Sequence, residues 1–266
     1  MSRTTIRKSN GAARPRLDRR GSLFGTLVVT HEAAEKQALD IIIANYQEEL
    51  LDPTLENPSA VHNNVANSMM KRGLIMDAIK HYRQALELTA SHDPAVLMNM
   101  GLAFKHLHNY DEAVTYFRMA LEIRPSADEH YNLANTLMKI DAGEKVNEAV
   151  IEYKECLKMD PNHANAHMNL GTALKESGHL EGAIVEFRCA LKLLVRDFNT
   201  HYNLANALVA KATVDEAKGV PQAKIDGSLQ EAVDQYEQVS PHIRPELRMS
   251  DELGFGGVCE QRGVEG

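Results

Sequence analysis

Four histidines occupy equivalent positions of a repeated phrase, and a histidine imidazole can ligate zinc or act as a base near neutral pH. The phrase HYNLAN stands at residues 130–135 and again at 201–206, and HMNLGT stands between them at 167–172. The histidine column comprises His62, His130, His167 and His201. If these side chains met at one point, they would form a metal site or an active site.

Repetition argues against such a convergence. The ligands of one zinc ion lie about 2 Å from it, whereas equivalent residues of stacked helix pairs are separated by on the order of 10 Å per helix layer. One copy of the phrase has Leu97 in the histidine column, and a position that accepts leucine is a packing position. We therefore predict that the histidines pack, and that the chain has no metal site and no catalytic residue.

Asparagines two residues after the histidine column set the period of the chain. This column comprises Asn64, Asn99, Asn132, Asn169 and Asn203, at intervals of 35, 33, 37 and 34 residues. A period near 34 residues indicates a repeat architecture. Each of these asparagines precedes a large apolar residue and then an alanine or glycine. The pattern predicts a helix that carries one position of close contact.

A second helix is predicted in each repeat. An alanine is followed four residues later by an aromatic residue and three further on by a small residue, as in Ala113, Phe117 and Ala120. Spacings of four and three place such residues on one helix face. The aromatic residues of this column are Tyr82, Phe117, Tyr153, Phe187 and Tyr236.

The two columns together resemble the tetratricopeptide repeat (TPR) family over residues 59–240. The resemblance implies an all-α fold, a right-handed solenoid of about five helix-turn-helix repeats. We place the array at 58–240, with repeats near 59–92, 93–126, 127–161, 162–196 and 197–240. The fifth repeat carries an insertion at 211–227, which we expect to project at the turn between its helices.

Three segments lie outside the predicted array. Residues 1–28 are rich in Arg, Ser, Gly and Pro and are predicted to be a disordered basic tail. Residues 29–57 are predicted to hold an N-terminal capping helix that begins near Thr30, since the end of a solenoid needs a cover. Its apolar residues include Ala34, Ala38, Ile41, Ile42 and Leu50. Residues 241–266 are predicted to be poorly ordered.

Composition excludes several function classes. The net charge of −8 combines a tail of +6 over residues 1–30 with a remainder of −14, which disfavours nucleic acid as a partner of the folded part. The sequence has no apolar run near 18 residues and no secretory signal, so we expect no membrane insertion and a cytoplasmic, or else nuclear, location. The three cysteines form no CxxC pair, and we expect no disulfide framework and no cofactor.

In the TPR family the first helix of each repeat lines a concave groove, and the resemblance therefore implies a peptide-binding surface there. Besides the asparagine column, we expect contributions from residues three positions later, namely Asn67, Leu102, Asn135, Thr172 and Asn206. The column one residue before the asparagines adds Asn63, Met98, Tyr131, Met168 and Tyr202. Lysines at the edge are Lys71, Lys105, Lys139 and Lys175. Amides can hold a peptide backbone of any sequence, and Met and Tyr offer adaptable apolar contacts.

We therefore predict a non-enzymatic scaffold that binds an extended segment of another protein. An asparagine ladder also resembles the repeats of O-linked N-acetylglucosamine transferases, so a detached substrate-binding region of such an enzyme is the alternative. A subunit that assembles through its convex face and the 211–227 insertion is a third possibility. The groove columns lack the cations of a two-carboxylate clamp, which disfavours chaperone tails as ligands. The oligomeric state is left open.

One short motif lies in the predicted tail. The sequence RRGSLF at residues 19–24 resembles a substrate of basophilic kinases, which makes Ser22 a candidate phosphorylation site. A phosphate there would remove up to about two charges from the basic segment. Nuclear import, attachment to an anionic surface and an organellar presequence are rival roles for the same arginines.

Overall fold

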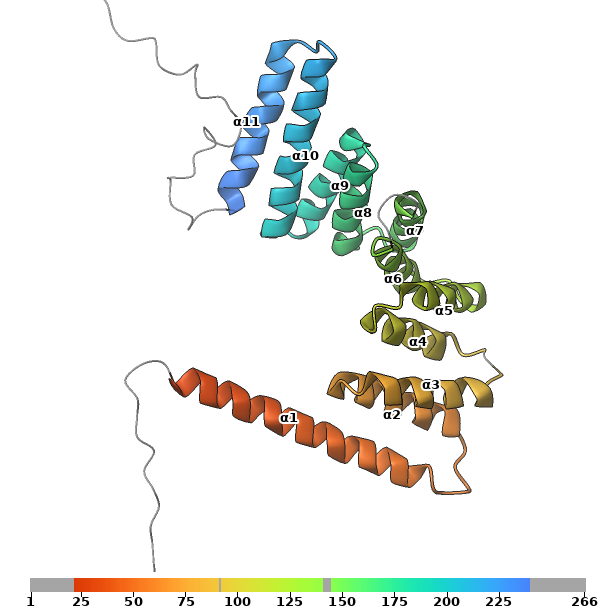
Figure 1. The fold of residues 1–266 in the computed structure, drawn as a ribbon. Helices are drawn as coiled ribbons and strands as arrows, with labels where there is room; N and C mark the ends of the chain where they lie inside the picture. Colours follow the sequence, from red (N-terminus) through yellow and green to blue (C-terminus); the bar gives the residue numbers. More distant parts are fainter. Residues whose placement is uncertain (1–21, 91, 141–144, 240–266) are drawn as a thin grey trace, which may run out of the picture. The chain divides into compact units, whose positions relative to one another are not determined.

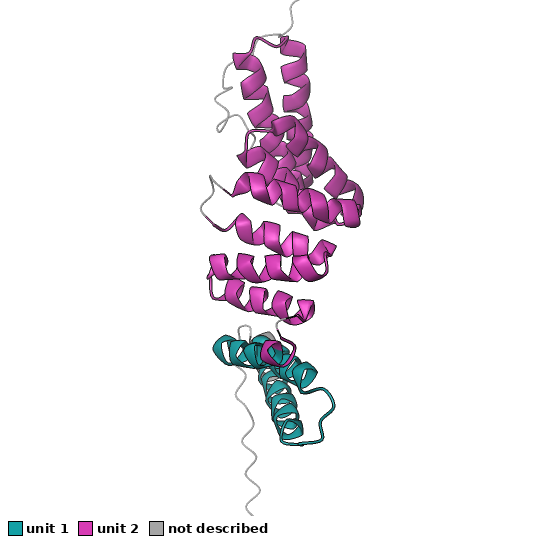
Figure 2. Ribbon diagram, turned by 90° about the vertical axis from the view of Figure 1, so that its right-hand side faces the viewer, with its two compact units in different colours: residues 1–85 teal, residues 86–266 magenta. Residues whose placement is uncertain are grey.

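The described part of this computed structural model comprises residues 22–90, 92–140 and 145–239, which form eleven α-helices and no strand (Figure 1). The chain divides into two compact units, residues 1–85 and residues 86–266 (Figure 2). The all-α helix pairs that the sequence predicted are therefore confirmed.

The first unit holds α1 (Ser22–Glu49), α2 (Pro58–Arg72) and most of α3 (Ile75–Leu88). Helix α1 packs against α2, and Arg72 of α2 pairs with Asp40 of α1 at 2.8 Å. Ile43 is buried and Leu39 is half-buried on this side of α1. The predicted apolar face was wrong in register, because Ile41 and Ile42 remain 56% and 41% exposed and Ile43 takes the inner position.

Helix α1 also begins earlier than predicted, at Ser22 and not near Thr30. Gly25 and the β-branched residues at 26 and 28–30 lower helix propensity by up to about 1 kcal/mol each, but no proline ends the helix there. The predicted tail is thus helical over 22–28, and its residues 1–21 lie outside the described residues. The predicted C-terminal tail, 241–266, lies outside them as well.

Four helix pairs make up the described part of the second unit. They are α4 (Pro94–His106) with α5 (Tyr110–Ile123), α6 (Ala127–Leu137) with α7 (Val146–Met159), α8 (Ala164–Glu176) with α9 (Leu180–Leu193), and α10 (Phe198–Ala217) with α11 (Gln222–Val239). We call the first helix of each pair the A helix and the second the B helix, and number the repeats 1 to 5 from α2–α3. A side chain caps the start of each A helix here, as Ser126 does for α6 by accepting from the Glu129 N–H.

The aromatic residue of each B helix packs against its A helix in one of two ways. In repeats 2 and 4 a phenylalanine ring lies over a glycine, and a Cβ added to Gly101 would stand 2.7 Å from Cε1 of Phe117. Gly171 and Phe187 show the same approach, also at 2.7 Å. In repeats 1, 3 and 5 the glycine is an alanine and the phenylalanine is a tyrosine. The repeats therefore alternate between a Gly–Phe type and an Ala–Tyr type.

The insertion of the fifth repeat lengthens both helices of the pair and is helical except at residues 218–221. Helix α10 has 20 residues, whereas the other A helices have 11 to 15 (Figure 1). Helix α11 has 18 residues, whereas the other B helices have 14. Pro221 falls in the short turn between them, and an ion pair between Lys211 and Asp215 lies within α10. Ala212 and Ile225 are buried, so the lengthened hairpin has apolar packing of its own.

The glycine contacts predict the result of a matched pair of substitutions. Gly101→Ala places a methyl group against the Phe117 ring and should lower the free energy of unfolding by about 1–3 kcal/mol. Gly227→Ala adds a methyl group to the interior of α11 with no atom within 4 Å, and should raise stability by up to about 1 kcal/mol. Urea unfolding followed by circular dichroism measures both. Equal effects of the two substitutions would contradict the packing argument.

A second prediction concerns pH. His62 of α2 and His81 of α3 meet with 2.9 Å between their Nδ1 atoms. Burial lowers the pKa of both histidines below the usual 6.5, and for His81 the nearby His62 lowers it further. Asp77 opposes this shift at His81 and Lys80 adds to it.

Because the folded protein then binds fewer protons than the unfolded chain, this contribution to stability is complete above about pH 6.5 and is lost as the pH falls below it. Between about pH 7.5 and about pH 5.5, the free energy of unfolding measured with urea should fall less for His81→Gln than for the unmodified protein. The control is His106→Gln, which replaces an exposed histidine, and its free energy of unfolding should fall as much as that of the unmodified protein.

Candidate functional site

The histidine column joins the two helices of repeats 1, 3, 4 and 5. The Nδ1 atoms of His130 and His167 each lie 2.6 Å from a B-helix glutamate, Glu152 and Glu186 respectively. In repeat 5, His201 Nδ1 lies 2.7 Å from Oε1 of Gln235. These histidines are half-buried, so the packing prediction was correct about their place but missed their hydrogen bonds.

Two of these imidazoles have a second partner. His167 Nε2 lies 3.1 Å from the carbonyl oxygen of Pro161, and His201 Nε2 lies 3.0 Å from that of Val195. A carbonyl can only accept, so Nε2 donates in both contacts. Neither ring nitrogen is then free to hold a metal ion. No group of three or more His, Cys, Asp or Glu side chains with metal-binding geometry occurs in the described part of the chain.

The second asparagine of HYNLAN fastens the A helix to the tyrosine of the B helix. The hydroxyl of Tyr153 donates to Asn135 Oδ1 at 2.7 Å. Tyr82 with Asn67 and Tyr236 with Asn206 make the same bond at 2.6 Å. Burial raises the pKa of Tyr153 far above its usual value, which keeps the hydroxyl protonated as a donor. The carbonyl oxygens of these three asparagines, predicted for the groove, are thus used inside the protein.

Asn169 of the main column joins repeat 4 to repeat 3. Its Nδ2 donates to Asn135 Oδ1 at 2.7 Å and to the hydroxyl of Tyr131 at 3.3 Å. The Tyr131 ring also lies 4.6 Å, between centroids, from the ring of His163. Sequence reasoning placed Asn169 and Tyr131 in the groove, whereas the structure gives both a contact between repeats.

Two other members of the main column have no such acceptor. Asn132 and Asn203 follow repeats of the Gly–Phe type, which hold Leu102 and Thr172 where repeat 3 has Asn135. Neither residue's side-chain amide hydrogen-bonds to any part of the described chain, and both are half-buried. The alternation of repeat types therefore decides which amides of the column remain available.

Apolar and basic side chains accompany these amides on the A helices of the second unit or, for Lys139, in the turn directly after α6. Met98 and Met168 are half-buried against the core. Lys105 and Lys175 are half-buried too, and burial together with neighbouring Lys139 lowers the pKa of Lys105. No carboxylate of the described residues pairs with these lysines. We call this set the A-helix face: Met98, Lys105, Asn132, Lys139, Met168, Lys175 and Asn203.

The remaining predicted positions are less informative. Asn64 is exposed and lies in the first unit, and Asn99 is half-buried in the second. Tyr202 is 52% exposed on α10. Ser22 is the first residue of α1, and its side chain lies outside the described residues.

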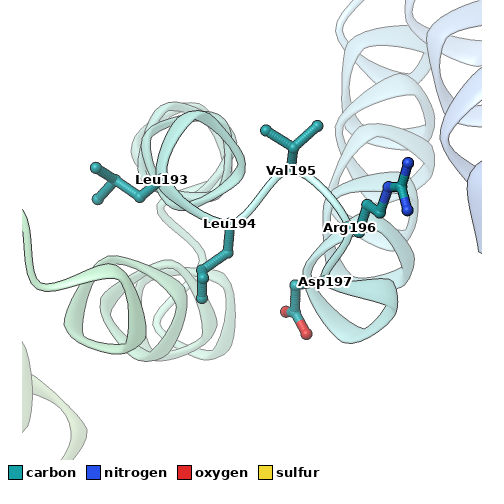
Figure 3. Close-up of a pocket in the computed structure, with 5 residues that line it drawn as sticks. All are labelled: Leu193, Leu194, Val195, Arg196 and Asp197. Carbon is teal, nitrogen blue, oxygen red and sulfur yellow. The ribbon is translucent and has the colours of Figure 1, made fainter.

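A shallow cavity of about 540 Å³ lies at the turn between α9 and α10 (Figure 3). Leu193, Leu194 and Val195 supply its apolar lining, and Arg196 and Asp197 supply its polar groups. Asp197 is already used as the cap of α10, where it accepts from the Thr200 N–H at 2.9 Å. No residue of the A-helix face takes part in this cavity.

Comparison with known proteins agrees with the repeat geometry. The family model described as tetratricopeptide repeat matches residues 58–126, and a second model of that description matches residues 152–185. Residues 58–126 and 152–185 are therefore tetratricopeptide repeats. A search of curated proteins finds no match.

Solved TPR structures share this fold. MamA 41-end from Desulfovibrio magneticus RS-1 has 22% identity and a TM-score of 0.59, over 70% of this chain and 95% of that one. YrrB, described as a TPR protein with an unusual peptide-binding site, has 20% identity and a TM-score of 0.58, over 71% and 91%. At such identities the likeness shows the TPR solenoid alone. The likeness to O-linked N-acetylglucosamine transferases stays a prediction.

A membrane-spanning helix was not expected, and no helix in the described ranges is long and apolar enough to be one. The charge argument against nucleic acid stays a prediction.

The bond between Asn135 and Asn169 predicts coupling between repeats 3 and 4. In a double-mutant cycle, the loss of unfolding free energy in the variant with both Asn135→Ala and Asn169→Ala should differ from the sum of the two single losses by about 0.5–1.5 kcal/mol. A cycle of Asn135→Ala with Asn206→Ala is the control, because those residues share no partner, and should add within about 0.5 kcal/mol. Additivity in both cycles would show that the bond between repeats contributes nothing.

Proposed function

We propose that this TPR protein is a non-catalytic scaffold that binds an extended segment of a partner protein along the A-helix face. One observation carries the proposal: the side-chain amides of Asn132 and Asn203 have no partner among the residues that the structure describes, whereas Asn135, Asn169 and Asn206 are all used inside the protein. A half-buried amide without a partner has both a donor and an acceptor to offer a ligand.

The chemistry of this face suits a peptide backbone. An amide can accept from a peptide N–H and donate to a peptide C=O whatever the side chains are. Met98 and Met168 add flexible apolar surface that adapts to different side chains. Lys105, Lys139 and Lys175 add positive charge at the edge, which favours a segment that carries carboxylates. The description of YrrB as a TPR protein with a peptide-binding site supports a ligand of this kind.

The asparagine column favours a second candidate, the substrate-binding region of a glycosyltransferase that resembles the O-linked N-acetylglucosamine transferases. Such a region would also hold extended protein segments by amides. The internal bond of Asn169 interrupts the run of available amides, which weakens this reading relative to a general scaffold. A nucleotide-sugar domain encoded in the same gene would favour it.

The proposal predicts that Asn132→Ala with Asn203→Ala weakens peptide binding. Random twelve-residue peptides displayed on phage provide the probe, and the enriched peptides are then measured by fluorescence anisotropy. The dissociation constant of the double variant should rise at least about tenfold, or about 1.4 kcal/mol. Circular dichroism should show intact helices, because neither amide makes an internal bond.

The matched control is Asn147→Ala, which removes an exposed asparagine from helix α7. It should leave the dissociation constant unchanged. Enriched peptides that bind the double variant as tightly as the unmodified protein would rule out the A-helix face as the binding surface.

A further inference from the structure

The two copies of HYNLAN provide the same contact site twice, and in the first copy the site is filled. Tyr131 Oη and Asn135 Oδ1 both accept from Nδ2 of Asn169, at 3.3 and 2.7 Å. The His163 ring at the start of α8 lies 4.6 Å from the Tyr131 ring. Helix α8 thus binds repeat 3 through one side-chain amide and one planar ring six residues before it.

The second copy has the same geometry. Tyr236 Oη donates to Asn206 at 2.6 Å, as Tyr153 does to Asn135 at 2.7 Å. The rings of Tyr202 and Tyr236 lie 5.9 Å apart at 64°, and those of Tyr131 and Tyr153 lie 6.2 Å apart at 56°. The acceptors Tyr202 and Asn206 are therefore held in place by the same B-helix tyrosine as in repeat 3.

No described residue fills this second site. Tyr202 is 52% exposed, and nothing in the described part of the chain stands where Asn169 and His163 stand in the first copy. Apolar surface extends from it along the same side of α10, since Phe198, four residues before Tyr202, is 53% exposed. Val209 continues this stripe and is half-buried.

We propose that this face of α10 binds a helix of a partner protein, seated as α8 is seated on repeat 3. The partner helix would present an Asn or Gln amide to Tyr202 and Asn206, and a histidine or aromatic ring to Tyr202 from about six residues earlier. The argument for this occupant is the filled copy of the site within the same chain. This interaction goes beyond the scaffold function proposed above, because its surface and the conformation of its ligand both differ.

The chain supplies its own probe. A labelled synthetic peptide of residues 160–194, which spans α8 and α9 and folds as it binds because a single helix pair needs a neighbour, should bind the full chain in fluorescence anisotropy. Tyr202→Ala in the full chain should weaken this binding at least about tenfold, and so should Asn169→Ala in the peptide. Asn206→Ala is a second variant that should weaken binding in the same way, with circular dichroism as the check of folding.

Tyr131→Ala is the matched control, because that tyrosine stands in an identical hexapeptide whose site α8 already fills. Tyr131→Ala should lower the free energy of unfolding and leave peptide binding unchanged. Tyr202→Ala should weaken peptide binding and leave the free energy of unfolding unchanged. Asn132→Ala, which tests the A-helix face, should also leave this binding unchanged, so the two proposals fail separately.

Several results would overturn the proposal. One is the absence of binding to the unmodified full chain, and another is equal binding by Tyr202→Ala. Binding that appears only after removal of residues 240–266 would identify that segment as the occupant. A stable dimer that Tyr202→Ala dissociates would identify a second copy of the chain instead.

Discussion

The contact between the B-helix aromatic ring and the A helix is the constraint on which each repeat depends. Phe117, Tyr153 and Phe187 are almost completely buried in these contacts, and full burial of such a ring contributes about 1.5–3 kcal/mol. A single helix pair cannot bury both of its faces, so each repeat also needs its neighbour. The small residue of the A helix follows from the requirement to seat this ring.

The chain meets this constraint in two ways, and the choice sets the residues around the ring. A phenylalanine ring occupies the space where a methyl group would stand, so the A helix has glycine. Where the B helix has tyrosine, the A helix has alanine in place of glycine. The tyrosine hydroxyl needs an acceptor, and the asparagine directly after that alanine provides it. This is why the phrase at residues 130–135 ends in Ala-Asn, whereas the phrase at residues 167–172 has Gly171 and no asparagine after it. What looked like a repeated functional motif is first a consequence of packing.

The sequence predicted the helix pairs well because packing repeats residue types at a fixed period. It predicted other features poorly where the signal was local or ambiguous. Ile41, Ile42 and Ile43 stand in succession, so periodicity could not choose the inner one. Gly219 and Pro221 form the turn between α10 and α11, and Gly227 lies within α11, so the whole segment resembled a loop, yet the residues on either side of the turn are helical.

The roles of the asparagines could not be assigned from one repeat, because the partner of an amide lies in the repeat before it. Asn169 finds an acceptor in Asn135, 34 residues earlier. The complementary columns were visible in the sequence, since each tyrosine of a B helix accompanies an asparagine in its A helix. Comparing those two columns would have separated the bonded amides from the others.

Position in the stack therefore decides what an identical phrase does. The first HYNLAN is covered by α8, so its tyrosine and second asparagine serve cohesion between repeats. The second stands on α10 with the same supporting bond from the B helix, but with its tyrosine exposed. The preceding repeat has Thr172 at the position equivalent to Asn135, so the first asparagine of this second copy, Asn203, lacks the acceptor that Asn169 has. A repeat protein gains binding residues where the alternation leaves a side chain without its internal partner, and this needs no new residue type.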